Sequence, residues 1–356
     1  MNKTMVGAVL TKPEVIEIRE LPVNFPGKGE ILLGIEAATT CGTDVKVFRR
    51  GGHPKMLVTP TPFGHEMAGY VAAAGPGVKN FREGDPIVVA NSAPCFVCAY
   101  CQQGRQNLCE DLHYLNGAFA EFIVVPRRFV EHNTHHIPKG LSFEKAALTE
   151  PLGCVLHGVK ACNLDELADI YKPEIIVFGA GPIGLMFVAA LSIRGLSVTL
   201  ADPNPERLLI GEVLGADRTI CIERGGGQAS LLRSKTRDGG GADVAIDATG
   251  VVEVWSDALA SIRPGGLVNL FGGCAPGSKM ILDTSEIHYK ELTIKGTYHH
   301  RPETIKSALN LLAEGTFPSN ILLSGERPIE ETEEALRSMM RKETLKVVIK
   351  PKLSRV

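Results

Sequence analysis

The chain has 356 residues, of which 44% are hydrophobic and 22% charged, and its formal net charge is −2. The length predicts two domains at about 150 residues each, and the composition is that of a folded protein rather than a disordered one. The near-neutral charge, with no basic run longer than two residues, argues against nucleic acid as a partner.

The ends and the apolar runs predict a cytoplasmic protein without a membrane partner. Residues 1–20 carry three glutamates and no apolar stretch of the signal-peptide type. No apolar run reaches the ~18 residues that a membrane span needs. Thiols stay reduced in the cytoplasm, so the nine cysteines need a role other than disulfide bonds.

The first 150 residues predict a β-rich domain. Short β-branched or alternating runs are separated by Gly and Pro turns, a spacing typical of a small barrel or sandwich. The expected strands are 15–18, 30–37, 68–73, 86–90 and 119–125. A helix is expected to begin at Glu150.

From about residue 152, strand and helix patterns alternate. The expected strands are 174–178, 197–201, 218–222, 243–247 and 267–271, and the expected helices are 182–194, 204–214, 229–236 and 252–262. Such alternation predicts right-handed βαβ crossovers and a parallel doubly wound sheet, so the chain belongs to the α/β class. The last part predicts helices at 303–314 and 332–340 and a closing strand at 345–349.

A glycine-rich turn follows the first strand of the alternating region. Residues 179–184, Gly-Ala-Gly-Pro-Ile-Gly, fit the pattern G-x-G-x-x-G between a strand and a helix. Gly179 permits a tight turn, Gly181 lets the backbone approach a pyrophosphate, and Gly184 lets the helix pack on the strand. The helix begins at Pro182, and its free N–H groups, from Ile183 onwards, and its partial positive charge are offered to phosphates.

An acidic residue ends the second strand of this region. Asp202 lies 18 positions after Gly184. A carboxylate there can accept hydrogen bonds from the adenosine ribose hydroxyls and would repel a 2′-phosphate, which favours NAD over NADP. Arg207 is close enough in sequence to line the adenine end. The alternative for Asp202 is a plain turn residue, because Pro203 follows it.

Four cysteines lie close together in the β-rich part: Cys95, Cys98, Cys101 and Cys109. Two-residue gaps let neighbouring sulfurs converge on one ion, and an all-cysteine set matches a closed, structural zinc site. An iron–sulfur cluster is the main alternative, although the ferredoxin pattern ends with a three-residue gap and Cys-Pro. Unrelated free thiols are the other alternative.

A catalytic zinc ion needs about three protein ligands and one open position. The candidates are Cys41, His65, Glu66 and Glu150. Spacing alone does not group residues so far apart, and Cys41 by itself fits a small buried hydrophobic residue equally well.

Together these segments resemble the zinc-dependent medium-chain alcohol dehydrogenases, and within them the polyol (sorbitol-like) and threonine dehydrogenase branch. The matching stretches run in family order. They are Cys-Gly-Thr-Asp at 41–44, Phe-Gly-His-Glu-Met-Ala-Gly at 63–69, Gly-Pro-Gly-Val at 75–78, the four-cysteine segment, Glu-Pro-Leu-Gly-Cys-Val-Leu-His-Gly at 150–158, and the glycine-rich turn.

The resemblance implies a GroES-like β-rich catalytic domain, residues 1–153 and 296–356, interrupted by a Rossmann NAD-binding domain, residues 154–295. Cys41, His65 and Glu150 match the family's catalytic zinc ligands. Glu66 matches a ligand in some members and a neighbour of the ligands in others, so the third protein ligand stays open. Thr43 matches the hydroxyl that hydrogen-bonds the substrate alcohol. Two zinc ions per chain are therefore expected, one catalytic and one structural.

The implied reaction is hydride transfer to NAD⁺ from a secondary alcohol, namely a polyol, a sugar or a related small molecule, with zinc as the Lewis acid. Ligands bind at the carboxyl ends of Rossmann strands, so contacts with ribose and nicotinamide are expected from Thr249, Gly250, Phe271 and Gly272. Threonine and simple-alcohol dehydrogenases are alternatives within the enzymes, and a non-catalytic zinc-binding protein is the alternative outside them. The family implies a homodimer or a homotetramer.

The sequence departs from the family pattern near the substrate. Lys46 stands where relatives often carry a relay histidine, and Thr-Tyr-His-His-Arg at 297–301 replaces the usual Arg-Tyr pair. The roles of Lys46, His53, His299 and His300 therefore stay open, as does the substrate. We expect His157 to be a core histidine and 135–136 a solvated turn. Buried thiols are expected at Cys154, Cys162, Cys221 and Cys274.

Overall fold

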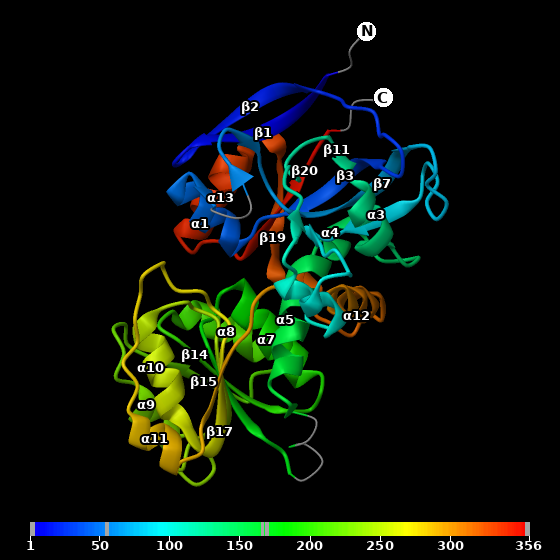
Figure 1. Cartoon of the computed structure of the whole chain (residues 1–356). Coiled ribbons are helices and arrows are strands. Elements are labelled where there is room, and N and C mark those ends of the chain that lie inside the picture. Colours follow the sequence, from blue (N-terminus) through cyan, green and yellow to red (C-terminus); the bar gives the residue numbers. More distant parts are fainter. Residues whose placement is uncertain (1–3, 54–56, 165–166, 168–170, 353–356) are drawn as a thin grey trace. The chain divides into compact units, whose positions relative to one another are not determined.

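The computed structural model describes residues 4–53, 57–164, 167 and 171–352 (Figure 1). The chain divides into two compact units. The first comprises residues 1–153, 300–315 and 322–356, and the second comprises residues 154–299 and 316–321. The boundary is thus crossed at residue 153, within the helix α5 (Thr149–Ala161), and again after His299, Gly315 and Ile321. Among the described residues, no helix is both long and apolar enough to cross a lipid bilayer.

The first unit is built mainly of strands. They are β1 (Thr4–Lys12), β2 (Val15–Pro22), β3 (Ile31–Thr39), β4 (Gly52–His53), β5 (Leu57–Val58), β6 (Thr61–Pro62), β7 (Glu66–Ala74), β8 (Pro86–Val89), β9 (Ser92–Ala93), β10 (His113–Tyr114), β11 (Phe122–Val125), β12 (Thr134–His136), β19 (Leu323–Pro328) and β20 (Lys346–Lys350). Its helices are α1 (Gly42–Arg50), α2 (Ala99–Gln102), η1 (Gln106–Leu108), α3 (Arg127–His132), α4 (Phe143–Ala146), the start of α5, α12 (Pro302–Ala313), η3 (Ile329–Glu331) and α13 (Thr332–Met340).

A seven-stranded sheet organises the first unit. Its order is β12-β8-β7-β3-β20-β19, and β11 pairs with β3 from outside this path. Strand β20, near the end of the chain, is antiparallel to β3 near its beginning, with Val348 opposite Thr39. Figure 1 accordingly shows the blue strands β1 and β2 and the orange to red elements β19, α13 and β20 in the same unit. The core beneath joins early residues such as Leu33 and Phe63 to late ones such as Val347.

The second unit is a doubly wound α/β domain. Its strands are β13 (Glu174–Phe178), β14 (Ser197–Asp202), β15 (Arg218–Cys221), β16 (Ala242–Asp247), β17 (Ile262–Leu270) and β18 (Thr293–Gly296). Its helices are α7 (Pro182–Ser192), α8 (Pro205–Val213), α9 (Ala229–Ser234), α10 (Val252–Ser261), α11 (Thr284–Tyr289) and most of η2 (Ser319–Leu322). The strands are parallel in the order β15-β14-β13-β16-β17-β18, with α9 and α10 on one side of the sheet and α7 on the other in Figure 1.

This strand order is the Rossmann arrangement, in which the winding reverses between the first and fourth strands. Here these strands are β13 and β16, and their carboxyl ends meet at Phe178 and Asp247. Ligands of such sheets bind outside this point. The fold therefore places residues 179–184 and 247–250 where a dinucleotide would lie.

The predicted alternation of strands and helices is confirmed, with element ends shifted by a few residues. Two smaller expectations were wrong. His135 and His136 are not a solvated turn but belong to β12, because they pair with Val88 and Ile87 of β8. Of the four thiols expected to be buried, Cys162 is buried, Cys154 and Cys274 are half-buried, and Cys221 is exposed because it ends β15 at the edge of the sheet.

Candidate active site and metal centres

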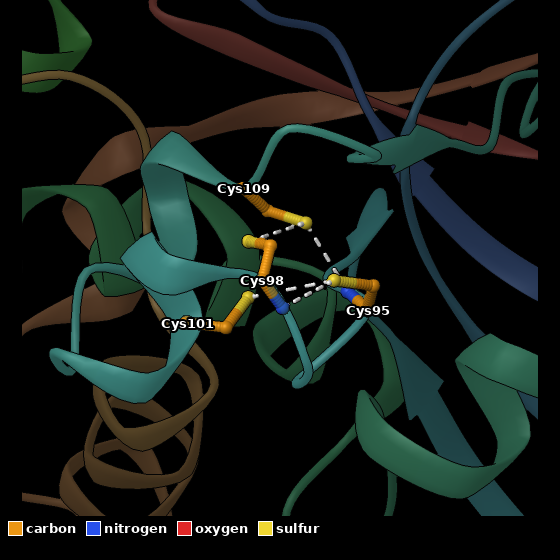
Figure 2. A group of neighbouring side chains, drawn as sticks. All are labelled: Cys95, Cys98, Cys101 and Cys109. Carbon is orange, nitrogen blue, oxygen red and sulfur yellow. Dashed lines mark hydrogen bonds between the residues drawn. The ribbon is translucent and has the colours of Figure 1, made fainter.

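The four-cysteine segment converges on one point. Figure 2 shows the sulfur atoms of Cys95, Cys98, Cys101 and Cys109 turned towards one another, and all lie within 4.8 Å of one another. The Cys95–Cys101 and Cys98–Cys109 Sγ–Sγ distances are both 4.0 Å. Four Zn–S bonds of ~2.3 Å in a tetrahedron place the sulfurs about 3.8 Å apart. The spacing fits one tetrahedral ion and is far longer than a disulfide bond.

Backbone N–H groups support these sulfurs. Val97 and Cys98 donate to Cys95 Sγ at 3.4 and 3.3 Å. Backbone hydrogen bonds, first from Glu110, lower the pKa of the Cys98 thiol to about 6, whereas burial raises the pKa of Cys101 to about 12. A bound cation would stabilise all four as thiolates, because coordinating thiols lose their protons.

Cys41 is held at the start of α1. It is the N-cap residue, with its sulfur 3.5 Å from the backbone nitrogen of Thr43, and its own N–H donates to Asp44 Oδ2 at 2.9 Å. These contacts fix the sulfur in a buried position at the end of the helix that favours negative charge. Burial nevertheless raises the pKa of the thiol, an effect that the Glu66 carboxylate adds to. A bound metal cation would instead lower the pKa of this thiol and stabilise its thiolate form.

His65 immediately precedes β7 and reaches the same place. Gly64, with φ +89°, makes the turn before it, and a Cβ at this glycine would lie 2.8 Å from the Phe119 ring. The Nδ1 atom of His65 lies 2.8 Å from Asp44 Oδ1, in a buried pair. Burial lowers the pKa of His65, but the charge and hydrogen bond of Asp44 outweigh it, so the pKa is raised. Asp44 thus orients the ring and leaves Nε2 for a ligand, the usual arrangement of a metal-binding histidine.

Glu66, the first residue of β7, is fully buried and completes this group. The ligand atoms of Cys41, His65 and Glu66 lie within 4.8 Å of one another. The carboxylate also accepts a hydrogen bond from the Thr39 hydroxyl and lies 2.7 and 2.9 Å from Lys346 Nζ by its two oxygens. A thiol, an imidazole and a carboxylate are the donor types of catalytic zinc sites, so the residues present fit this ion.

Glu150 lies in the first turn of α5, close to this group but not among its three members. It is buried, and His300 Nε2 lies 3.9 Å from its Oε1. Burial raises the pKa of the Glu150 carboxyl to about 7, with His65 opposing and Glu66 adding to the rise. The carboxyl is therefore near enough to feel the charges of the predicted zinc site.

Thr43 and Lys46 lie one turn apart on α1. Thr43 is half-buried and Lys46 is exposed. The hydroxyl thus stands two residues from Cys41, on the helix that positions it, and the lysine stands further towards solvent.

The glycine-rich turn has the geometry of a phosphate loop. Gly179 has φ +97°, and a Cβ at Gly184 would lie 1.7 Å from the Gly179 oxygen. Gly181 is the N-cap of α7 without a side-chain cap, and a Cβ there would meet nothing within 4 Å. Pro182 is the first helical residue and Ile183 lies in the first turn. The open space beside Gly181, at a helix start, fits a bound pyrophosphate.

Asp202 and Arg207 both contact this turn. Asp202 accepts hydrogen bonds from the backbone nitrogens of Ala180 at 2.7 Å and Asn204 at 2.8 Å. Arg207, from α8, donates to the Ala180 oxygen at 3.4 Å. Asp202 therefore does more than a plain turn residue would, because its carboxylate also links the end of β14 to the glycine-rich turn by a hydrogen bond.

The residues predicted beyond β16 form a second turn. Asp247, which sequence reasoning did not single out, accepts from Thr249 N and Gly250 N at 3.1 and 3.0 Å and from Trp255 Nε1 at 2.9 Å. A Cβ at Gly272 would lie 2.3 Å from Gly250 N, so the two turns touch. Phe271 instead packs its ring edge-on against Phe187, with centroids 5.0 Å apart.

One buried residue was missed, and another was predicted. Lys346 was not singled out, although a lysine inside the apolar run 345–349 is the signal that could have found it. His157 is a buried histidine whose Nδ1 lies 2.6 Å from the His299 carbonyl oxygen, as expected of a core residue.

Comparison with known proteins agrees with this geometry. Residues 27–138 match the alcohol dehydrogenase GroES-like domain, and residues 182–314 match the zinc-binding dehydrogenase domain. The chain belongs to the zinc-dependent medium-chain alcohol dehydrogenases. It is accordingly an oxidoreductase of alcohols that uses zinc and NAD(P), with a GroES-like and a Rossmann domain.

Its relatives place it in the polyol and threonine branch. It is 34% identical to the D-altritol 5-dehydrogenase of Agrobacterium fabrum, over 88% of this chain and 90% of that one. Identity is 32% to the sorbitol dehydrogenase of Bacillus subtilis, over 98% of both chains. The L-threonine 3-dehydrogenase of Pyrococcus furiosus is 31% identical, over 98% of this chain and 99% of that one.

Two solved structures bear on the cofactor. A zinc-binding dehydrogenase of Sinorhizobium meliloti bound to NADP has a TM-score of 0.87 and 27% identity, over 98% of this chain and 100% of that one. An alcohol dehydrogenase of Escherichia coli CFT073 complexed with NADH has a TM-score of 0.85 and 26% identity, over 98% and 99%. Both forms of the nicotinamide cofactor thus occur among similar folds.

Proposed function

We propose that this enzyme oxidises a secondary alcohol of a polyol, a sugar or a related small molecule with NAD⁺, at a zinc ion held by Cys41, His65 and Glu66. The observation that carries the proposal is the convergence of a thiol, an imidazole and a carboxylate within 4.8 Å, all three buried. Three ligands leave one position for the alcohol oxygen. Glu66 is the third ligand on this proposal, since Glu150 lies outside the group.

Zinc supplies Lewis-acid polarisation of the alcohol oxygen, which lowers the alcohol's pKa, and the nicotinamide supplies the hydride acceptor. The protein's residues do the rest. The Thr43 hydroxyl would receive the proton of the substrate hydroxyl while releasing its own towards solvent, because Thr43 is half-buried on α1 and Lys46, one turn along the helix, is exposed. Asp44 holds the His65 ring, and Glu150 places a second buried carboxyl group beside the ligands.

A Cys41→Ser variant tests the catalytic assignment. We expect turnover to be lost while the fold and NADH binding remain, because the thiolate is a metal ligand and the cofactor residues lie in the second unit. Cys221→Ser, at an exposed cysteine outside both metal sites, is the matched control and should keep full turnover. A Cys41→Ser enzyme with normal turnover would refute the site. A wild-type protein that binds zinc but oxidises no alcohol would favour the non-catalytic alternative.

The second proposed zinc ion is structural and lies among Cys95, Cys98, Cys101 and Cys109. The four sulfurs leave no open position, and their 4.0 Å separations support one ion. Two zinc ions per chain, measured by mass spectrometry of the native protein, are expected. The measurement should return one in a Cys41→Ser variant that loses the catalytic ion.

We propose NAD rather than NADP as the cofactor because the Asp202 carboxylate stands at the end of β14, where a 2′-phosphate would meet its charge. Replacement by alanine should lower NAD⁺ affinity and raise the NADP⁺/NAD⁺ ratio of kcat/KM. The substitution also removes the hydrogen bond from Ala180 N to Asp202, which should weaken the binding of NAD⁺ and NADP⁺ equally. The ratio of kcat/KM for the two cofactors is therefore the deciding measurement. An unchanged ratio would refute the role of the carboxylate.

The polyol class is supported by the relatives named above, which act on altritol and sorbitol, and the L-threonine 3-dehydrogenases keep threonine as the second candidate. A panel of polyols, sugars, threonine and simple alcohols, each with NAD⁺ and NADP⁺, decides between them. The highest kcat/KM on a polyol supports the proposal. The highest kcat/KM on threonine would instead identify the enzyme as a threonine dehydrogenase.

We also propose a homodimer or homotetramer. Strand β18 hydrogen-bonds to β17 on one side, and no strand of the described residues lies on its other side, so its edge is available to a second copy. Sedimentation velocity should show no monomer at micromolar concentration. The nine cysteines, all free thiols, support the cytoplasm as the compartment.

A further inference from the structure

Lys346 is a charged residue in the interior of the first unit. Of the described lysines and arginines, it alone is buried, with a side chain 1% exposed. Strand β20 brings it from near the chain end to the start of β7, across 280 residues of sequence. A buried ammonium is costly unless it is paired, so its partners should explain its presence.

The partners of Lys346 are specific. Its Nζ donates to the Thr40 carbonyl at 2.7 Å and to Glu66 Oε1 at 2.9 Å, and it lies 2.7 Å from Glu66 Oε2. The Thr39 hydroxyl donates to Oε2 as well. Both oxygens of the carboxylate are therefore engaged from the side of β3 and β20, which fixes the plane and the position of Glu66.

Three further groups that can carry negative charge are buried nearby. Asp44, Glu150 and the Cys41 thiol lie around His65 and Glu66, and all are buried. Lys346 is the cation in direct contact with Glu66, and although burial opposes its charge, Glu66 and then Cys41 outweigh burial and raise the pKa of Lys346. On the function proposed above, a zinc ion would bind beside the same Glu66 carboxylate.

We propose that Lys346 is a positioning residue of the catalytic metal centre, serving as the internal counter-ion that holds Glu66 in place before the metal binds and that weakens the hold of Glu66 on the metal afterwards. The inference rests on the proposed role of Glu66. Two cations then share one carboxylate, so removing the lysine leaves zinc as the cationic partner of Glu66, beside the hydrogen bond from the Thr39 hydroxyl.

Lys346→Met tests the proposal, because methionine keeps much of the volume and removes the charge. In the metal-free protein Glu66 loses its partner, so thermal stability falls. In the zinc-loaded protein the metal replaces that partner, so stability falls less. The zinc-induced rise in melting temperature should therefore be larger than in the wild type. By the same thermodynamic cycle, zinc affinity in a competition with a fluorescent chelator should increase at least tenfold.

Lys350→Met is the matched control. Lys350 lies on the same strand and pairs with Glu144, away from the metal centre. Its loss should lower the melting temperatures of the metal-free and zinc-loaded protein equally. A double variant, Lys346→Met with Glu66→Gln, removes both charges, and its zinc-induced rise should return to the wild-type value or below.

The outcomes separate the inference from the proposed function. A zinc-induced rise in Lys346→Met that is no larger than in the wild type overturns the inference. If Cys41→Ser responds to zinc as the wild type does, the proposed metal site fails instead. Lys346→Met that folds only with zinc, or only when combined with Glu66→Gln, supports the counter-ion role. Failure of both variants to fold assigns Lys346 to packing and overturns it.

Discussion

Two neighbouring glycines of the phosphate loop should respond to the same substitution in different ways. In Gly184→Ala the new Cβ would lie 1.7 Å from the Gly179 carbonyl oxygen and 2.9 Å from its carbon. In Gly181→Ala the Cβ would meet nothing within 4 Å, and the backbone at φ −75° and ψ 174° accepts any residue. The first substitution therefore tests packing, and the second tests the space reserved for the ligand.

The cost of Gly184→Ala follows from what can move. The obstructing atom is backbone, and Gly179 is itself held by a hydrogen bond from its N–H to Ala201 O at 2.8 Å. Helix α7 cannot withdraw either, because residues 184–191 are buried. Overpacking typically costs 1–3 kcal/mol, so we expect about 3 kcal/mol, which lowers the melting temperature by roughly 6 °C or more. The displaced loop should also lose cofactor affinity.

Gly181→Ala should leave the melting temperature within about 1 °C of the wild type but weaken NADH binding about ten- to a hundredfold, since a methyl group would stand where the pyrophosphate approaches the backbone. Thermal unfolding measures the melting temperature, and nicotinamide fluorescence titration measures the NADH affinity. Wild-type NADH affinity in Gly181→Ala would refute the pyrophosphate site. Wild-type stability in Gly184→Ala would refute the close approach of helix and strand.

Three further outcomes are expected. Cys109→Ser should remove one zinc ion per chain by mass spectrometry and speed tryptic cleavage after the exposed Arg105, because the metal holds this segment folded. The free energy of unfolding of the metal-free protein should fall by up to about 3 kcal/mol as the pH rises from 4.5 to 7. Burial raises the Glu150 pKa from 4.5 to about 7, so in this range the folded state holds a proton that the unfolded chain has released. Urea titrations should show that this fall is absent in Glu150→Gln. Asp247→Ala should shift the emission of Trp255, the single tryptophan, and lower stability by about 2 kcal/mol, because four donors lose their acceptor; unchanged emission would contradict it.

Most of the second unit could be predicted from its sequence, although helix α11 and strand β18 were missed. Its signals are local: β-branched runs, helical periodicity and a glycine turn follow one another at short range, and the parallel sheet follows from their alternation. The first unit offered less. Strand β1 was missed, because its run Thr4–Lys12 includes a glycine and gives no clear alternation, and the position of β20 beside β3 depends on a contact between distant parts of the chain.

The metal-site residues also differ in how far the sequence predicts them, depending on whether they lie close together in the chain. The four-cysteine centre was predictable because its ligands lie within fifteen residues, whereas Cys41, His65 and Glu66 came together only through the resemblance to a family. Lys346 escaped because its role is defined by Glu66, and no local pattern joins β20 to β7. The preference for Glu66 over Glu150 as third ligand likewise depends on side-chain distances that sequence spacing does not contain.

The interrupted chain gives the metal centre a particular dependence on the whole protein. Residues 41–66 supply the proposed ligands, yet the cation that stabilises Glu66 without metal lies in the last strand, after the entire second unit. Until β20 docks beside β3, a buried carboxylate and thiol would lack their counter-charge, so the first 150 residues have little reason to form a stable metal site alone. The zinc centre is therefore complete only after β20 has paired with β3. Because β20 follows the second unit in sequence, stable metal binding requires the chain to be continued through that unit to β20.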